Sequence, residues 1–503
     1  MRQEIDELLE RLDEVAQLQG TAALLNWDQA TYMPTGGAET RGRQLALITR
    51  LAHEKFVDPA VGSLLDRLER HLNDLDPHSF EARLITVTRF DFERATRVPA
   101  EFLAQLERHA SRGYQLWARA RPANDFGLVR EHLERTVELS RLYASFFGGY
   151  EHVADALIDE SDRGMTVARL RPLFGELRSE LLPLLERQRH AQDDAASSLL
   201  HGCFPREAQI AFGEEVIRDF GFDFLRGRQD LSHHPFAISF GSGDVRITTR
   251  VKEHDLSEAL FSTLHEAGHA MYEQGMDDFL DGTPLSGGVS SGVHESQSRL
   301  WENLVGRSLE FWGHYYPRLQ ERFPDQLMRI GLGAFYRAVN RVQPSLIRTD
   351  ADELTYNLHV MIRFDLECEL LEGSLPVRDL AEAWRARYLS DLGVESEGDG
   401  DGVLQDMHWY SGLVGGAFQG YTLGNILSAQ LFAAAREAHP EIPDEIAQGR
   451  FDTLHDWSRR NIWRHGRKYT PDELVESSCG SGLTTAPYIR YLERKYDELG
   501  SVV

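Results

Sequence analysis

Apolar residues recur three and four positions apart through most of the chain, which places them on one face of an α-helix. Leucine and phenylalanine occupy these positions, and arginine and glutamate occupy the opposite face, as expected for helices that pack against a core. The pattern therefore predicts a mainly α-helical protein. In the first part of the chain it predicts helices over residues 3–25, 38–57, 78–95, 99–118 and 126–145.

The later part of the chain carries the same helical pattern, in segments that glycine and proline separate. Asp255 begins one of these helices and forms a capping box with Glu258 in this prediction, and Gly275 ends the helix. A second predicted helix begins near Val293, and a third begins after Pro344 and continues to about residue 371. The last predicted helices cover residues 426–437, 443–464 and 485–498.

One stretch departs from the helical period. Residues 237–240 and 245–249 alternate with period two around the turn Gly241-Ser-Gly-Asp244, which predicts a β-hairpin just before the helix that begins at Asp255. An edge strand there could hold an extended peptide by main-chain hydrogen bonds, or the hairpin could simply cover one end of the core. The sequence leaves both interpretations open.

Length and composition favour one large folded unit. At 503 residues the chain is long enough for about three domains, but no long tract rich in proline, serine or glycine divides it. We therefore expect a single domain over residues 1–503 with two lobes, a helical N-terminal part over about 1–200 and a further part over about 230–425.

The charge balance excludes some classes of partner. A formal net charge of −26 argues against binding to nucleic acid or to an anionic membrane surface. Among the 54 basic residues the lysines are Lys55, Lys252, Lys468 and Lys495, so nearly all of the basic residues are arginine. Such a composition fits a salt-adapted proteome, but arginine bias also follows from genome composition, and the sequence does not separate the two.

The cysteines and the chain start indicate the compartment. The three cysteines, Cys203, Cys368 and Cys479, are widely spaced, which argues against a disulfide framework or a cysteine metal site. The first residues form an amphipathic pattern that differs from a signal peptide, and no run of 18 apolar residues occurs. We expect a soluble cytoplasmic protein.

The strongest chemical motif is His265-Glu266-Ala-Gly-His269, on the helix that begins at Asp255. Residues four apart share a helix face, so His265 and His269 point the same way and could bind one Zn²⁺. Glu266, beside the first histidine, is placed to act as a general base. The alternative is a helix on which two histidines merely lie near each other.

A third ligand candidate follows a turn-rich loop. Glu295 lies 26 positions beyond His269, after the segment 281–292 that glycine and serine dominate. A chain reversal there would bring its carboxylate to the two histidines. The resulting His, His, Glu set leaves a fourth position open, as in catalytic zinc sites. Alternatively, Glu295 is a solvated carboxylate in the first turn of a helix.

Several further motifs accompany these, and together the chain resembles the thermostable (Taq-type) metallocarboxypeptidase family, whose members carry a His-Glu-x-x-His helix. The resemblance rests on motifs spread along nearly the whole chain, namely Trp27-Asp28 to Met33-Pro34, His234-Pro-Phe236, Asp244-x-Arg246-x-Thr248, the His265 helix, His294-Glu295-Ser-Gln, Ile347-Arg348-x-x-Ala-Asp352 and Gly402-x-x-Gln405-Asp406-x-His408-Trp409.

The resemblance implies a large helical fold with a small β-sheet beside the metal helix, a deep groove with the metal at its floor, and a homodimer. It implies release of single residues from peptide C-termini with broad specificity. It also implies that His265, His269 and Glu295 bind zinc, or cobalt in some members, that Glu266 is catalytic, and that Arg348 and Tyr421 hold the substrate's C-terminal end.

Other site residues have weaker support. Tyr421 and His408 are candidate donors to the oxyanion, and Arg246 is a candidate substrate-binding residue. His408 could instead be a core histidine paired with Asp406. One stretch departs from the family pattern, because the run Leu413–Tyr421 lacks a proline that members usually carry and is one residue longer, which affects the alignment of Tyr421.

Arg348 suits carboxylate capture because a guanidinium forms two parallel hydrogen bonds and stays charged. The alternative is an ion pair with Asp350 or Asp352. Two functions of other classes also remain at this point. A di-iron carboxylate bundle would need a second Glu-x-x-His motif, which is not evident, and an inactive scaffold would not need Glu266 and all three ligand positions intact.

Overall fold

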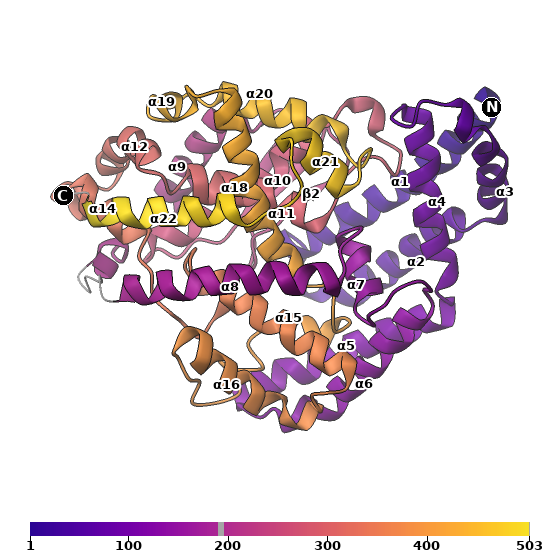
Figure 1. The fold of residues 1–503 in the computed structure, drawn as a ribbon, viewed down its shortest axis with the longest axis horizontal. Helices are drawn as coiled ribbons and strands as arrows, with labels where there is room; N and C mark the ends of the chain where they lie inside the picture. The colour runs from indigo at the N-terminus through magenta and orange to yellow at the C-terminus, as the bar shows by residue number, and fades with distance from the viewer. Residues whose placement is uncertain (190–195, 502–503) are drawn as a thin grey trace.

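The computed structural model describes residues 1–189 and 196–501 and confirms the mainly helical prediction (Figure 1). The predicted helices of the first part all form, with ends shifted by a few residues. The first of them continues past Trp27 and ends at Thr31, shortly before Pro34, a residue that lacks the N–H group needed inside a helix. The helices of this part are α1 (Arg2–Thr31), α2 (Ala38–Phe56), α3 (Pro59–Leu68), α4 (Phe80–Arg97), α5 (Ala100–Ala123), α6 (Gly127–Ser145), α7 (Asp155–Ser161) and α8 (Val167–Arg189).

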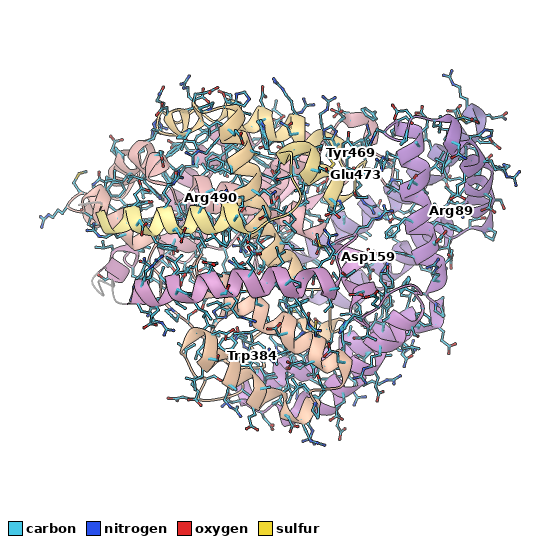
Figure 2. All side chains as sticks on the ribbon, viewed as in Figure 1. Arg89, Asp159, Trp384, Tyr469, Glu473 and Arg490 are labelled. Atoms are coloured by element: carbon cyan, nitrogen blue, oxygen red, sulfur yellow. The ribbon has the colours of Figure 1, made fainter. Side chains whose placement is uncertain are left out.

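The first four helices gather at one end of the molecule, at the right of Figure 1. Leucines, isoleucines and valines of α1, α3 and α4 pack into a small core of their own with Leu280 and Leu285. Ion pairs tie this end to the C-terminal part. Arg83 of α4 donates to Glu473 at 2.8 Å and lies over Tyr469, and Figure 2 labels Tyr469 and Glu473 close together on that side.

A three-stranded sheet, with strand order β1-β3-β2, precedes the helix that begins at Leu256. The predicted hairpin is confirmed as β2 (Ala237–Ser239) antiparallel to β3 (Val245–Thr249), with Ile238 opposite Arg246. The strand β1 (Gly227–Leu231), which pairs with β3 in parallel, was not predicted from the sequence. Its sequence, Gly-Arg-Gln-Asp-Leu, has no alternation of apolar residues that would indicate a strand.

The remaining helices build the larger core around the site. They are α9 (Arg206–Phe220), α10 (Leu256–Gly275), α11 (Ser291–Arg299), α12 (Leu309–Arg322), α13 (Pro324–Leu327), α14 (Leu332–Val339), α15 (Tyr356–Glu372), α16 (Leu380–Leu392), α17 (His408–Ser411), α18 (Gln419–Ala438), α19 (Ile442–Ile446), α20 (Asp452–Asn461), α21 (Pro471–Cys479) and α22 (Ala486–Ser501). Within the described ranges, no helix has both the length and the apolar character that a membrane span requires.

Three details of the prediction are wrong. Asp255 caps α10 by accepting from the Ser257 N–H, but no capping box forms, because Glu258 pairs with Arg250 and Lys252. The predicted helix over 443–464 is two helices, α19 and α20, since Gly449 takes a left-handed conformation between them, with φ of 69°. The segment after Pro344 begins with a single 3₁₀ turn, Arg348–Asp350, and α15 starts later.

Glycines of α10 and α18 allow both helices to pack closely against α11, which carries Glu295. A Cβ on Gly268 of α10 would lie 2.5 Å from the carbonyl oxygen of Gln297 and 2.7 Å from the Cα of Ser298, both in α11. A Cβ on Gly424 of α18 would lie 2.4 Å from Cγ of Glu295. Only glycine lets α10 and α18 approach α11 this closely, so these contacts fix where Glu295 stands relative to α10.

We predict that Gly268→Ala lowers the free energy of unfolding by about 1–3 kcal/mol, because its methyl group meets backbone atoms that cannot rotate away. Gly313→Ala on α12 is the matched control, since its Cβ meets nothing within 4 Å, and we expect a gain of about 0.5–1 kcal/mol. Thermal unfolding of both variants checks this. An unchanged midpoint for Gly268→Ala would contradict the close-packing account.

Candidate functional site

The helices α10 and α11 bring the three predicted ligands together. His265 and His269 lie one turn apart on α10, and Glu295 lies in the second turn of α11. Oε2 of Glu295 is 3.6 Å from Nε2 of His265 and 3.3 Å from Nε2 of His269. Ligand atoms of a tetrahedral zinc ion, each about 2.0–2.2 Å from it, lie roughly 3.4 Å apart. The residues present therefore fit a single divalent ion.

The ring of His265 is oriented by a carboxylate behind it. Its Nδ1 lies 2.9 Å from Oε2 of Glu302, so the ring donates a proton there and turns Nε2 toward the ligand cluster. Burial disfavours the protonated ring, but the carboxylates of Glu295 and Glu302 outweigh this and raise the pKa of His265.

A largely buried arginine, with 13% of its side chain exposed, compensates the charges of the two carboxylates. Arg299 donates from Nε to Glu295 at 2.7 Å and from Nη1 to Glu302 at 3.3 Å. Burial alone would raise the pKa of Glu295, but Arg299 and His265 together hold it well below its usual range. Burial likewise opposes ionisation of Glu302, and Arg299 with His265 lowers the pKa of Glu302 to about 2. Glu295, a candidate metal ligand, is thus ionised at neutral pH.

Glu266 has a different environment from the other two glutamates. Its side chain is buried and makes no hydrogen bond with any residue that the structure describes. Burial raises the pKa of Glu266 to about 7, and the nearby Glu295 adds to this. A carboxylate with a pKa near neutrality and free oxygens is suited to accept and return a proton.

Beside the ligands lies a cavity of about 430 Å³. The charged and aromatic residues of its lining are His269, Glu273, His294, Glu295 and Tyr421, and glycine, serine and alanine complete it. Tyr421 stands in the first turn of α18, and its hydroxyl bonds to no residue in the described ranges. Burial raises the pKa of Tyr421 to about 12, so the hydroxyl remains a proton donor at neutral pH.

Arg348 is buried, and its partners are Asp406 and Tyr356. It donates to Asp406 from Nε at 3.1 Å and from Nη2 at 2.8 Å, and from Nη1 to Tyr356 at 3.0 Å. The alternative pairing with Asp350 or Asp352 is wrong, because Asp352 instead accepts from backbone N–H groups at the start of the next helix.

The pairing of Asp406 leaves a surplus of positive charge. Asp406 also accepts from Nε of Arg363 at 2.6 Å, so two buried guanidinium groups share one carboxylate. Of the five N–H donors of Arg348, three are used within the described part of the chain, which leaves one on Nη1 and one on Nη2. The guanidinium carbon of Arg348 lies 5.2 Å from the centre of the Tyr421 ring. Because Tyr421 lines the cavity, this contact connects the Arg348–Asp406–Arg363 cluster to it.

His408 and Arg246 lie outside the cavity lining. Nδ1 of His408 is buried without a hydrogen-bond partner among the described residues and is 3.8 Å from Asp406, too far for a hydrogen bond. Burial lowers the pKa of His408 to about 4. Arg246 forms a bidentate pair with Asp244 and stacks on Trp27, with 4.3 Å from guanidinium carbon to ring centre.

Arg299 and Glu302 were not predicted as site residues from the sequence. They follow Glu295 by four and seven positions, the spacing of one helix face, and this could have indicated that all three act together. Residues Leu300–Val305 form a π-helical turn, a form that often occurs at functional sites and that the sequence does not signal.

Comparison with known proteins agrees with this geometry. The sequence model of the family "Carboxypeptidase Taq (M32) metallopeptidase" matches residues 7–496. Thermostable carboxypeptidase 1 of Thermus thermophilus is 41% identical over 501 residues, which cover 98% of both chains. Carboxypeptidase 1 of Bacillus subtilis is 34% identical over 493 residues, again covering 98% of both.

Solved structures show the same fold. The M32 carboxypeptidase from Deinococcus radiodurans R1 is 52% identical and superimposes with a TM-score of 0.97, covering 99% of this chain and 100% of the other. Metallocarboxypeptidase 1 of Trypanosoma cruzi is 33% identical with a TM-score of 0.94, covering 99% and 100%. Since both the family match and these relatives span almost the whole chain, the protein belongs to the carboxypeptidase Taq (M32) family of metallopeptidases.

Proposed function

We propose that this carboxypeptidase releases single C-terminal amino acids from peptides of varied sequence, with one Zn²⁺ ion held by His265, His269 and Glu295. The observation that carries the proposal is the convergence of these three ligand atoms beside the unpaired, buried carboxylate of Glu266. Co²⁺ fits the same donor set.

A divalent ion in this site would supply Lewis-acid activation of the attacking water and of the scissile carbonyl. Glu266 takes the proton of that water and delivers it to the leaving amine, a role suited to a buried carboxylate that has no hydrogen-bond partner among the described residues. Tyr421 supports the oxyanion by donating its hydroxyl proton in a hydrogen bond, since its high pKa keeps the proton in place. His408 remains a second candidate donor.

Selectivity for the end of a chain needs a group that recognises a free carboxylate. We assign this to Arg348, because its two unused N–H donors and the surplus charge of the Arg348–Asp406–Arg363 cluster favour an anion. Arg246, paired with Asp244 near Trp27, is proposed to act further along the bound peptide.

Two other functions fit less well. A di-iron centre would need a second set of ligands, but the described residues contain one group of at least three such side chains whose ligand atoms lie within 4.8 Å of one another. A peptide-hydrolysis assay distinguishes an active enzyme from an inactive scaffold, which would release no amino acids. The homodimer that the family resemblance implies stays a prediction, which sedimentation velocity tests.

The first prediction concerns the metal. We expect one divalent ion per chain, loss of activity with a chelator and recovery with Zn²⁺ or Co²⁺. The metal-free protein should stay largely folded, because the site is surrounded by a large apolar core that stabilises the fold. Small zinc fingers lack such a core and unfold without their metal. Metal analysis, activity and circular dichroism check this. Global unfolding on metal removal would contradict it.

The second prediction separates base from ligands. Glu266→Gln should keep its metal, because Glu266 is no ligand, and should lower kcat by ~10² to 10⁴-fold. His269→Ala should lose metal and activity together. Metal content and steady-state kinetics on both variants decide between these roles, and an emptied site in Glu266→Gln would show the division to be wrong.

The third prediction concerns Arg348. Arg348→Ala should lower kcat/KM for free-acid peptides by ~10²-fold or more, because a charge-assisted contact is lost. The wild type should discriminate against C-terminally amidated peptides, and the variant should not. Asp350→Ala is the matched control, an exposed neighbour that forms no pair with Arg348, and it should behave as wild type. Equal cleavage of acid and amide by the wild type would contradict the assignment.

A further inference from the structure

The two histidine ligands are held in different ways. His265 has Glu302 on its Nδ1, at 2.9 Å, and this hydrogen bond fixes the plane of the ring. Nδ1 of His269 is buried and has no hydrogen-bond partner within residues 1–189 and 196–501. A hydrogen bond of this kind is the usual device that orients a metal-binding histidine, so the orientation of His269 needs another cause.

That cause is a second imidazole, lying flat against the first. The ring of His294, from α11, stacks on His269 with 4.5 Å between centroids and 15° between planes. The same ring also stacks on Tyr272, one turn further along α10, at 5.4 Å and 28°. A flat ring packed over two side chains of one helix face restricts rotation of both about χ2.

The ring of His294 is itself held on two further sides. Its Nε2 lies 2.8 Å from Oε1 of Glu273 on α10. The backbone of Gly288 closes against it, since a Cβ added there would lie 2.6 Å from Cδ2 of His294. The stacking, the hydrogen bond with Glu273 and the backbone contact with Gly288 together fix the orientation of the His294 ring.

We propose that His294, anchored by Glu273, is the positioning residue for His269. By fixing the plane of the His269 ring, it directs Nε2 of His269 toward Oε2 of Glu295, 3.3 Å away. This is close to the separation expected for two ligand atoms of one tetrahedral metal ion. Glu302 orients one histidine through a hydrogen bond, and the His294–Glu273 pair orients the other through its ring face.

A direct role for His294 agrees less well with the geometry. As a metal ligand it would need a ring nitrogen close to the cluster, but neither Nδ1 nor Nε2 of His294 joins the three ligand atoms of His265, His269 and Glu295 that lie within 4.8 Å of one another. It also lines the cavity, so a substrate contact is the main competing role. A substrate contact predicts a raised KM, whereas a positioning role predicts weakened metal binding.

The inference rests on the proposed metal site, and Co²⁺ titration against a competing chelator tests the two separately. Wild type should bind one Co²⁺ and show the visible absorption of a low-symmetry site. His294→Ala and His294→Leu should bind Co²⁺ about 10- to 100-fold more weakly, the range found when the support of a ligand is lost. His294→Phe keeps a flat ring and should stay within about threefold of wild type.

Controls make each result informative. His314→Ala removes a histidine from an edge contact with Tyr315 outside the site and should leave Co²⁺ affinity unchanged. Glu273→Ala should weaken Co²⁺ binding less than His294→Ala, because the stacked ring remains. The comparison of Leu with Phe does not depend on the alanine variant folding, since both fill the space.

Three outcomes would overturn the inference. Equal Co²⁺ affinity and spectra in wild type, Leu and Phe variants would show that the ring face does not position His269. A raised KM with unchanged Co²⁺ affinity would make His294 a substrate contact. Absence of Co²⁺ binding by the wild type would overturn the proposed site and this inference with it.

Discussion

The site depends on keeping three carboxylates together inside the protein. Glu266, Glu295 and Glu302 are all buried, and an isolated buried carboxylate is strongly destabilising. Arg299, itself largely buried, bonds to two of them and keeps both ionised. Glu266 is left without such a partner, and its pKa rises. Arg299 thereby separates two ionised carboxylates, Glu295 and Glu302, from Glu266, the carboxylate proposed to exchange a proton.

The opposite balance of charge exists at the other end of the site. Arg348 and Arg363 share Asp406, so that end holds surplus positive charge, whereas the metal end holds surplus carboxylate. Tyr421 links the two, since it lines the cavity with Glu295 and its ring contacts Arg348. A cation and a peptide carboxylate are thus favoured at separate places on one rigid core. The proposed selectivity for the end of a peptide chain rests on this separation.

The sequence could predict the parts of this arrangement that local spacing controls. Helical period, the His265–His269 pair and the hairpin around Gly241 all depend on residues close in sequence, and the structure confirms each. Strand β1 was missed because its only support is pairing with β3, a contact that its own residues do not signal. The partner of Arg348 was missed for the same reason, since Asp406 is 58 positions away.

Side-chain support beyond the ligands was also outside the reach of the sequence. Glu302 lies in the π-helical turn that follows α11, and no residue type predicts such a turn. The stacking of His294 on His269 follows from the close approach of α10 to α11 at Gly268, which a one-dimensional pattern does not contain.

The central claim is that His265, His269 and Glu295 bind one metal ion while Glu266 stays outside its coordination. X-ray absorption at the zinc edge of the loaded enzyme, compared with Glu266→Gln, measures this most directly. We expect two imidazole nitrogens and carboxylate oxygen at about 2.0–2.2 Å, with identical protein ligands in the variant. A third imidazole, sulfur in the first shell, or loss of an oxygen ligand in Glu266→Gln would contradict the account.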